Sequence, residues 1–289
     1  SHAEFNGQVY ELTDKLRSKA KRISDDMNRN GMRVLAIAQK SFISKARDFA
    51  VTDEDEMVLI GYLAFLDPPK PSSAEAIRQL REYGIEVKIL SGDNDVIVSA
   101  IARQIGIDTC HSVTGVELEG KDGEELREIV GQATLFSRLT PLQKSEIIMI
   151  LQQNGNTVGF LGDGVNDAGA LRQSDIGISV DSAVDIAKES ADIILLDKDL
   201  SVLKEGVLEG RKTFGNITKY IKMTASSNFG NMFSVMFASA FLPFLPMLPI
   251  HLLIQNLLYD ISQTTIPFDR MDAEFLKQPQ KWDASDLSR

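Results

Sequence analysis

The longest stretch of this chain without a charged side chain runs from Met223 to Tyr259. One helix needs about 20 apolar residues to cross the hydrocarbon core of a bilayer, so the stretch has room for two crossings. Pro243, Pro246 and Pro249 divide it and predict the turn of a helical hairpin. Two long helices buried in a soluble core are the alternative.

Basic residues flank this stretch on both sides, and the cytoplasmic flanks of membrane helices are rich in Lys and Arg. They are Arg211, Lys212, Lys219 and Lys222 before the stretch, and Arg270 and Lys277 after it. The pattern predicts a multi-pass protein of the plasma membrane whose soluble domains lie in the cytoplasm.

Charge and cysteine content argue against two other classes of protein. The 289 residues carry a formal net charge of -10 without a basic block, so we expect no nucleic-acid partner. Cys110 is the single cysteine, which leaves no internal disulfide and no cysteine-based metal site.

The hydrophobic pattern changes once before the hairpin. Residues 9–28 predict a helix and residues 32–39 a buried strand, and an apolar run follows at 57–65. The prolines in Asp67-Pro68-Pro69-Lys70-Pro71 then stop regular structure and predict a domain boundary or hinge.

From residue 73 onward, short apolar strands alternate with helices. We expect helices at 73–83, 95–105, 143–153, 168–173 and 182–189, and strands at 87–90, 157–161, 176–178 and 193–196. This alternation favours an α/β fold with a parallel sheet covered on both faces. Ligands of such folds gather at the carboxyl ends of the strands.

Two polar loops follow predicted strands at those ends. They are Ser91-Gly92-Asp93 and Gly162-Asp163-Gly164-Val165-Asn166-Asp167. Their glycines let the backbone turn tightly beside a ligand, and the carboxylates of Asp163 and Asp167 suit Mg²⁺ that is held together with phosphate oxygens. Ordinary turns are the alternative, because Asp, Asn and Gly favour turns by themselves.

A third polar segment, Thr140-Pro141-Leu142-Gln143-Lys144, lies between the two loops at the start of a predicted helix. Lys144 can place a positive charge on a phosphoryl group, which phosphoryl transfer requires. A solvated surface lysine is the alternative.

Asp67-Pro68-Pro69-Lys70 and the three polar segments, in this order, resemble the successive signatures of the P-type cation-transporting ATPases. The phosphorylation domain of this family has the haloacid-dehalogenase fold. The resemblance covers nearly the whole chain, and the residues from Asn256 to Gln263 and from Lys277 to Trp282 are most similar to the bacterial magnesium-transporting branch.

The resemblance implies a role for each polar segment. Ser91 and Gly92 would bind the phosphoryl group and Lys144 would neutralise it. Asp163 and Asp167 would hold Mg²⁺ directly or through water, with Asn166 nearby. Asp93 and Arg33 would approach ATP.

The resemblance also implies a division of the chain into four parts. Residues 1–61 would be the C-terminal part of an α+β nucleotide-binding domain, and residues 62–208 the C-terminal portion of the phosphorylation domain. Residues 209–268 would form a stalk and two transmembrane helices, and residues 269–289 a cytoplasmic loop.

Three features depart from the family pattern. Ser91 stands where the family has Thr, Gly169 stands where it often has Pro, and the Asp-Lys-Thr-Gly segment with the phosphorylated Asp is absent. We therefore expect a fragment that is inactive alone and whose partner is the missing N-terminal half of the same pump. Without the strand that carries this Asp, we expect unpaired groups at a sheet edge.

Polar side chains inside the hairpin are candidate ligands of a transported cation: Asn228, Asn231, Asn256 and Asp260. Asn256 and Asp260 are four residues apart and share one helical face, as do Asn228 and Asn231 three apart. The asparagines could instead bond between helices as packing contacts. Oxygen ligands disfavour copper and zinc, and the resemblance favours Mg²⁺ over Ca²⁺ or a monovalent cation.

These observations predict part of an ATP-driven pump that imports Mg²⁺ through an aspartyl-phosphate intermediate, with the phosphorylated Asp outside this chain. A membrane-anchored, non-catalytic module that binds phosphate or Mg²⁺ is the alternative. A phosphatase of the same fold is a third reading, against which the missing nucleophile argues.

Overall fold

The computed structural model describes residues 2–41, 50–66, 68–197 and 199–282. Asp67 of the predicted proline segment therefore lies outside the described residues. Internal contacts divide the chain into two compact units. The first comprises residues 1–77 and 87–198, and the second comprises residues 78–86 and 199–289.

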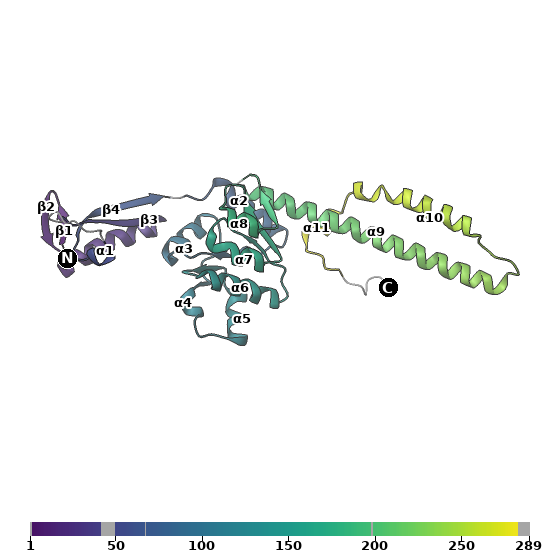
Figure 1. Cartoon of the computed structure of the whole chain (residues 1–289), viewed down its shortest axis with the longest axis horizontal. Coiled ribbons are helices and arrows are strands. Elements are labelled where there is room, and N and C mark those ends of the chain that lie inside the picture. The colour runs from purple at the N-terminus through teal and green to yellow at the C-terminus, as the bar shows by residue number, and fades with distance from the viewer. Residues whose placement is uncertain (1, 42–49, 67, 198, 283–289) are drawn as a thin grey trace. The chain divides into compact units, whose positions relative to one another are not determined.

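The first unit begins with a four-stranded sheet in the order β2-β1-β4-β3 (Figure 1). Its strands are β1 (His2–Phe5), β2 (Gln8–Glu11), β3 (Met32–Gln39) and β4 (Val58–Leu66). Helix α1 (Asp14–Arg29) contacts β3, and a short 3₁₀ helix, η1, covers Val51–Asp53. The predicted strand at 32–39 is present with the same bounds, but most of its residues are exposed on the described chain, so its predicted burial is wrong. The apolar run at 57–65 is confirmed as β4 within one residue.

The prediction of one helix from residue 9 is wrong at its start. Asn6 and Gly7 have φ angles of 51° and 78°, which form a tight hairpin turn, so the residues that follow pair with β1 as strand β2. The helix begins only after Thr13, whose Oγ1 accepts a hydrogen bond from the backbone N–H of Leu16.

The remainder of the first unit contains two three-stranded parallel sheets, in the orders β5-β7-β6 and β10-β9-β8. Their strands are β5 (Ile89–Leu90), β6 (Ser112–Thr114), β7 (Leu135–Ser137), β8 (Gly159–Leu161), β9 (Ile176–Val180) and β10 (Ile193–Leu195). The predicted α/β fold with parallel strands is confirmed. Among the described residues, β5 and β8 each pair with one strand only, so each has an open edge.

Helices accompany these strands, and the predicted ones are present within three residues of their expected bounds. They are α2 (Pro71–Glu82), α3 (Asp95–Gln104), α4 (Gly115–Leu118), α5 (Gly123–Gln132), α6 (Pro141–Gln153), η2 (Val165–Asp167), α7 (Ala168–Gln173) and α8 (Asp185–Ser190). Strands β6 and β7 and helices α4 and α5 were not predicted. The main core packs Phe136, Val130 and Ile147, which are at most 1% exposed, between β7, α5 and α6.

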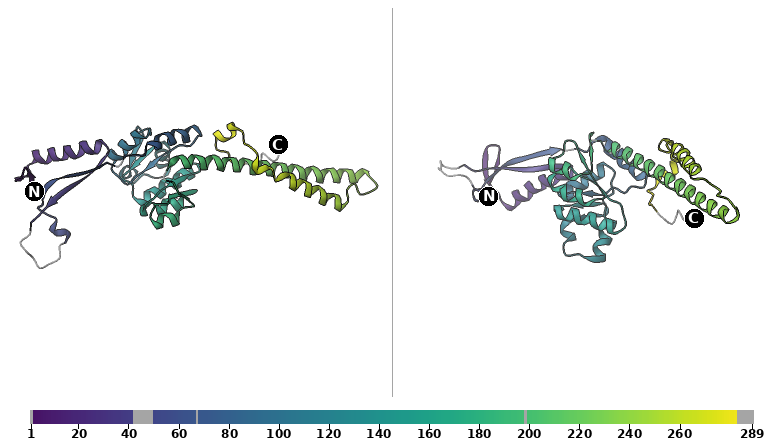
Figure 2. Two further views of the ribbon diagram at one scale, coloured as in Figure 1. Left: turned by 90° about the horizontal axis from the view of Figure 1, so that it is seen from above. Right: turned by 45° about the vertical axis from the view of Figure 1, so that its right-hand side comes forward.

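The second unit is built on one long helix, α9 (Leu200–Phe241), and on α10 (Pro249–Gln263), which runs alongside it (Figures 1 and 2). Pro249 is at the first turn of α10, where its missing N–H costs nothing. The predicted helical hairpin is thus present as two helices. Within the described residues, no helix has both the length and the apolar character needed to cross a membrane.

The segment after α10 folds back onto α9. It contains the 3₁₀ helix η3 (Ile266–Phe268) and the helix α11 (Ala273–Lys277). A Cβ at Gly215 would meet the end of the Met271 side chain, so a larger residue there would require Met271 to shift. Arg211 donates to the carbonyls of Leu276 at 2.7 Å and Tyr83 at 2.8 Å, and partial burial lowers the pKa of its guanidinium.

Candidate active site

The Ser91-Gly92-Asp93 loop follows β5 and is held by its own hydrogen bonds. Ser91 N–H donates to the carbonyl of Phe136 at 2.9 Å, and Asp93 N–H donates to Oγ of Ser91 at 3.1 Å. Asn94 then caps α3 by accepting from Val96 N–H at 2.9 Å. The Ser91 hydroxyl is therefore anchored between a strand end and a helix start.

The second loop, from Gly162 to Asp167, follows β8 and closes on itself. Oδ2 of Asp167 accepts from Gly164 N–H at 3.2 Å, and Asp167 N–H donates to the Gly164 carbonyl at 3.1 Å. A Cβ at Gly162 would lie 2.6 Å from Cβ of Asp167, so glycine is required there. Buried Ser179 supports the loop, because its Oγ donates to the Gly162 carbonyl at 2.8 Å.

Lys144 reaches this second loop from the first turn of α6. Its Nζ lies 2.7 Å from Oδ1 of Asp167, and the two side chains are only 12% and 13% exposed. Thr140 starts the helix, with Oγ1 accepting from Gln143 N–H and the Gln143 side chain accepting from Thr140 N–H. Lys144 is thus a partly buried cation and not the solvated surface lysine of the alternative reading.

The segment between β7 and α6 connects the two loops. Arg138 N–H donates to the Asp93 carbonyl at 2.9 Å, and Leu139 N–H donates to the Ser91 carbonyl at 3.0 Å. Arg138 has a φ of 52°, and its guanidinium donates twice to Oδ1 of Asp95, at 3.0 and 2.7 Å. Residues 138–139 therefore hold the first loop while the helix that follows brings Lys144 to the second.

Arg33 on β3 points to the first loop across the first unit. Its Nη2 lies 3.2 Å from Oδ1 of Asp93, which joins two residues that the resemblance assigns to ATP. Both side chains are at least half exposed, so the pair itself stabilises the fold little.

The donor set of the second loop fits Mg²⁺. Asp163 and Asn166 are exposed, while both carboxylate oxygens of Asp167 already accept hydrogen bonds. Mg²⁺ takes oxygen ligands and keeps several waters, so one open carboxylate with phosphate oxygens suffices. Asp163 can ligate an ion directly, and Asp167 can do so through water or after Lys144 leaves it.

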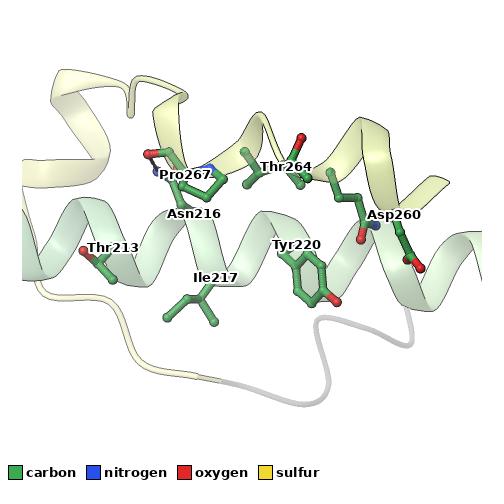
Figure 3. Close-up of a pocket in the computed structure, with 9 residues that line it drawn as sticks. Thr213, Asn216, Ile217, Tyr220, Asp260, Thr264 and Pro267 are labelled. Carbon is green, nitrogen blue, oxygen red and sulfur yellow. Dashed lines mark hydrogen bonds between the residues drawn. The ribbon is translucent and has the colours of Figure 1, made fainter. Parts of the chain in front are cut away.

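The four candidate ion ligands of the hairpin differ in their exposure and in their contacts. Asn231 faces α10, where its Oδ1 accepts from Nε2 of Gln255 at 2.8 Å. Asn228, Asn256 and Asp260 are exposed on the described chain. Among the described residues, none of these three side chains takes part in a hydrogen bond between α9 and α10, although Asp260 lines a pocket together with residues of α9 (Figure 3).

The face of α10 that contacts α9 carries residues that the sequence reasoning missed. Gln255, Tyr259 and Gln263 are spaced four apart, and Gln263 donates to Oγ1 of Thr224 at 3.0 Å. Among the described residues, Oε1 of Gln255 and the hydroxyl of Tyr259 are buried without a partner. Their spacing of four residues, which puts them on one helical face, was the sequence signal that could have identified these residues.

Comparison with known proteins fits this geometry. A profile of the family described as "haloacid dehalogenase-like hydrolase" matches residues 3–175. The chain belongs to this family. Both polar loops and Lys144 lie within the matched residues, so the haloacid-dehalogenase-like fold predicted from the sequence is confirmed.

Within this haloacid dehalogenase-like family, the relatives are P-type ATPases, as predicted. The chain is 54% identical over 289 residues to "Magnesium-transporting ATPase, P-type 1" of Escherichia coli and equally to that of Salmonella typhimurium. It is 32% identical over 282 residues, 96% of the chain, to "Calcium-transporting ATPase 1" of Bacillus cereus. Each alignment covers all or nearly all of this chain but 32% of the relative, so the chain spans about a third of the length of these proteins.

Proposed function

We propose that this chain is part of an ATP-driven P-type pump that imports Mg²⁺ across the bacterial plasma membrane. The observation that carries the proposal is the partly buried Lys144–Asp167 pair at the carboxyl end of β8, next to exposed Asp163. This is the charge arrangement that a phosphoryl group with Mg²⁺ requires. A Ca²⁺ pump is the second candidate, favoured by the 32% identity to a calcium-transporting ATPase.

The loop residues would stabilise a phosphoryl group on an aspartate outside this chain. Bound Mg²⁺ would neutralise charge on the phosphoryl oxygens. Ser91 Oγ and the Gly92 backbone would donate to those oxygens, and Lys144 would add a positive charge. Asp163, Asp167 and Asn166 would hold the ion and its waters.

The aspartate would come from a strand in the missing N-terminal half of the same pump. The open edges of β5 and β8 support this, because both strands end in the polar loops and both have room for one more parallel neighbour. A strand between them would bring its carboxyl end to Ser91 and Asp163 together.

ATP would lie where Arg33 meets Asp93. The guanidinium of Arg33 is exposed and can contact phosphate while Asp93 keeps it oriented. We accordingly propose residues 1–61 as the C-terminal part of a nucleotide-binding domain and residues 62–208 as the phosphorylation domain portion.

The hairpin of α9 and α10 would lie in the lipid bilayer, as part of a stalk and two crossings at 209–268 before a cytoplasmic loop at 269–289. Large apolar side chains exposed on these helices support this, since soluble surfaces rarely carry so many together. They include Phe229, Phe233, Phe237, Phe241, Leu253, Leu257 and Leu258, each at least half exposed. Asn228, Asn231, Asn256 and Asp260 would contribute oxygen ligands for the transported cation.

Phosphoenzyme formation from radiolabelled ATP tests the proposal in the intact pump that contains this chain. Asp163→Ala should abolish the acid-stable phosphoenzyme, because no open carboxylate remains to hold Mg²⁺. The matched control is Asp175→Ala, a carboxylate outside the loop that accepts from Val158 N–H. Normal phosphorylation of Asp163→Ala would contradict the proposed catalysis and favour a non-catalytic Mg²⁺- or phosphate-binding module.

A further inference from the structure

Ser179 is a polar side chain at a strand position that an apolar one would fill more favourably. It lies on β9, the central strand of the sheet in the order β10-β9-β8, and it is 0% exposed. A buried hydroxyl costs free energy that Val or Ala would not cost there, and Ser does not favour strands. Where a sequence breaks a local rule of this kind, the residue is expected to serve the site.

The hydroxyl of Ser179 bonds to the loop that follows β8. Its Oγ donates to the Gly162 carbonyl at 2.8 Å, while the Gly162 N–H donates to the Ile178 carbonyl at 3.1 Å. The paired residues of β8 and β9 end at Leu161 and Ile178. Gly162 is therefore the first residue beyond this ladder, and both of its main-chain polar groups are bonded to β9, one of them through a side chain.

The position of the Gly162 peptide affects both candidate metal ligands of the loop. The Gly162 carbonyl belongs to the same planar peptide unit as the N–H of Asp163, so fixing this carbonyl fixes the direction in which the chain enters Asp163. A Cβ at Gly162 would lie 2.6 Å from Cβ of Asp167, so Gly162 also packs directly against the second carboxylate residue. A shift of this one peptide would displace Asp163 and disturb Asp167.

The other hydrogen bonds of the loop act on different groups. The Asp163 carbonyl accepts from Val184 N–H at 3.2 Å, and the Asp167 carboxylate accepts from Gly164 N–H at 3.2 Å. These bonds hold the residues after the Gly162 peptide, whereas Ser179 holds the peptide at which the strand becomes the loop. Metal ligands must be held to within about 0.5 Å, and a buried residue on a central strand supplies a rigid support.

We propose that Ser179 is a positioning residue that sets the Mg²⁺ affinity of the loop through the Gly162 carbonyl. The inference rests on the proposed function, in which Asp163 and Asp167 hold Mg²⁺ beside a phosphoryl group. Ser179 is not a ligand itself, because its hydrogen is donated to Gly162 and its side chain has no exposed surface. Without this hydroxyl, the buried Gly162 carbonyl loses its donor and the peptide turns, which moves Asp163 away from the ion.

Ser179→Thr and Ser179→Val test the proposal as a pair, because both add a branched side chain of the same shape and only Thr keeps the hydroxyl. Beryllium fluoride, which mimics a phosphoryl group on a carboxylate, should protect the intact pump against thermal unfolding when Mg²⁺ is present. The protection seen without fluoride is subtracted, which removes the effect of Mg²⁺ bound in the hairpin. The measured quantity is the Mg²⁺ concentration that gives half of the remaining protection.

This half-saturating concentration should rise about tenfold in Ser179→Val and stay within about twofold of the wild type in Ser179→Thr, as expected for a residue that orients a metal ligand. Val is at least as favourable as Thr in a buried strand, so a general loss of stability would not produce this difference. Equal concentrations in the two variants would overturn the proposal.

Ser179→Ala adds no atom to the core and replaces the pair if the larger side chains prevent folding. It should raise the half-saturating concentration about tenfold, and an unchanged value would overturn the proposal. Ser190→Ala is the matched control, because Ser190 is 7% exposed and its Oγ accepts from Nε of Arg172 at 3.2 Å, between α8 and α7. It should lower the unfolding temperature and leave the half-saturating concentration unchanged. An equal rise in Ser190→Ala and Ser179→Ala would overturn the proposal in favour of a general loss of packing.

Failure of this proposal can be told apart from failure of the proposed function. Asp163→Ala should abolish the fluoride-dependent protection by Mg²⁺ together with the phosphoenzyme. Protection of Asp163→Ala at wild-type Mg²⁺ concentrations would overturn the role of the loop in Mg²⁺ binding, and the proposed function with it. Loss of protection in Asp163→Ala, with equal half-saturating concentrations in Ser179→Thr and Ser179→Val, would overturn the role of Ser179 alone.

Discussion

The Nζ of Lys144 lies 2.7 Å from Oδ1 of Asp167, and the two side chains are partly buried at the carboxyl end of β8. Oδ2 of the same carboxylate accepts from Gly164 N–H. The lysine thus occupies the position that a cation would take beside Asp167. Mg²⁺ and a phosphoryl group together would supply new partners for both charges.

This pair predicts a stability that depends on Mg²⁺. Lys144→Met should destabilise the protein by about 3 kcal/mol in Mg²⁺-free buffer, because it leaves a buried carboxylate unpaired. Mg²⁺ should restore more stability in the variant than in the wild type. Urea unfolding with and without Mg²⁺ measures both effects.

Lys121→Met is the control for that measurement. Lys121 pairs with Glu125 on the surface, where an ion pair contributes at most about 1 kcal/mol. Similar losses in the two variants, with no response to Mg²⁺, would contradict the role given to Lys144.

The close approach at Gly115 predicts a loss of stability on adding one methyl group. A Cβ there would lie 2.5 Å from the Arg138 carbonyl and 2.8 Å from Oε1 of Gln143, so Gly115→Ala should cost about 1–3 kcal/mol. Gly131→Ala in α5 meets its nearest neighbour at 3.7 Å and should instead stabilise by about 0.5–1 kcal/mol. Thermal unfolding of the two variants should shift the transition in opposite directions, and a shared direction would contradict this packing.

The hydrogen bonds to the Glu117 carboxylate predict that the stability of the fold depends on pH in the acid range. The backbone N–H and the hydroxyl of Thr114 donate to its carboxylate at 2.7 and 2.8 Å and lower its pKa. A lowered pKa in the folded state means that this stabilisation is present above the ordinary pKa of Glu, about 4.3, and is lost as pH falls through the lower folded value.

Replacement of Glu117 should therefore flatten that dependence. Between about pH 5 and 3, a range that begins above the ordinary pKa of Glu, the wild type should lose more urea resistance than Glu117→Gln. Glu119→Gln, on an exposed residue just beyond α4, is the control and should follow the wild type. Parallel pH profiles for Glu117→Gln and the wild type would show that the carboxylate is not stabilised by Thr114.

Replacing Arg33 should weaken the affinity for ATP without changing the stability of the fold. Its contact with Asp93 is exposed, so Arg33→Ala should alter the free energy of unfolding by less than about 0.5 kcal/mol. Loss of one charge-assisted contact to phosphate should raise the Kd for ATP about tenfold in the intact pump. Arg29→Ala is the control for general loss of positive charge, because Arg29 pairs with Asp26 on the surface of α1.

Local sequence patterns predicted the elements that carry the candidate site better than the elements between them. The loops at Ser91 and Asp163 follow apolar runs that are strands, and the Thr140-Pro141 start of α6 is a capping signal that acts locally. Strand β7 (Leu135–Ser137) was missed because three buried residues have no periodicity to read. The Asn6-Gly7 hairpin was a local signal that was overlooked.

The spacing of polar residues along the sequence could not by itself predict which face of α10 contacts α9. Periodicity correctly puts Asn256 and Asp260 on one face, but it does not say which face meets the neighbouring helix. Contacts with α9 decide this, through Gln255 with Asn231 and Gln263 with Thr224. Likewise, the partner that Lys144 finds in Asp167 depends on the packing of α6 against the loop after β8.

ATP-driven movement of Mg²⁺ out of proteoliposomes that contain the intact pump, with ATP added outside, tests the central claim most directly, because an importing pump moves the ion toward the side on which it binds ATP. A fluorescent Mg²⁺ indicator should report transport by the wild type and none by Asp260→Asn, which removes the candidate carboxylate ligand of the hairpin. Transport of Mg²⁺ at the wild-type rate by Asp260→Asn, or ATP hydrolysis by the wild type without any movement of Mg²⁺, would contradict the account.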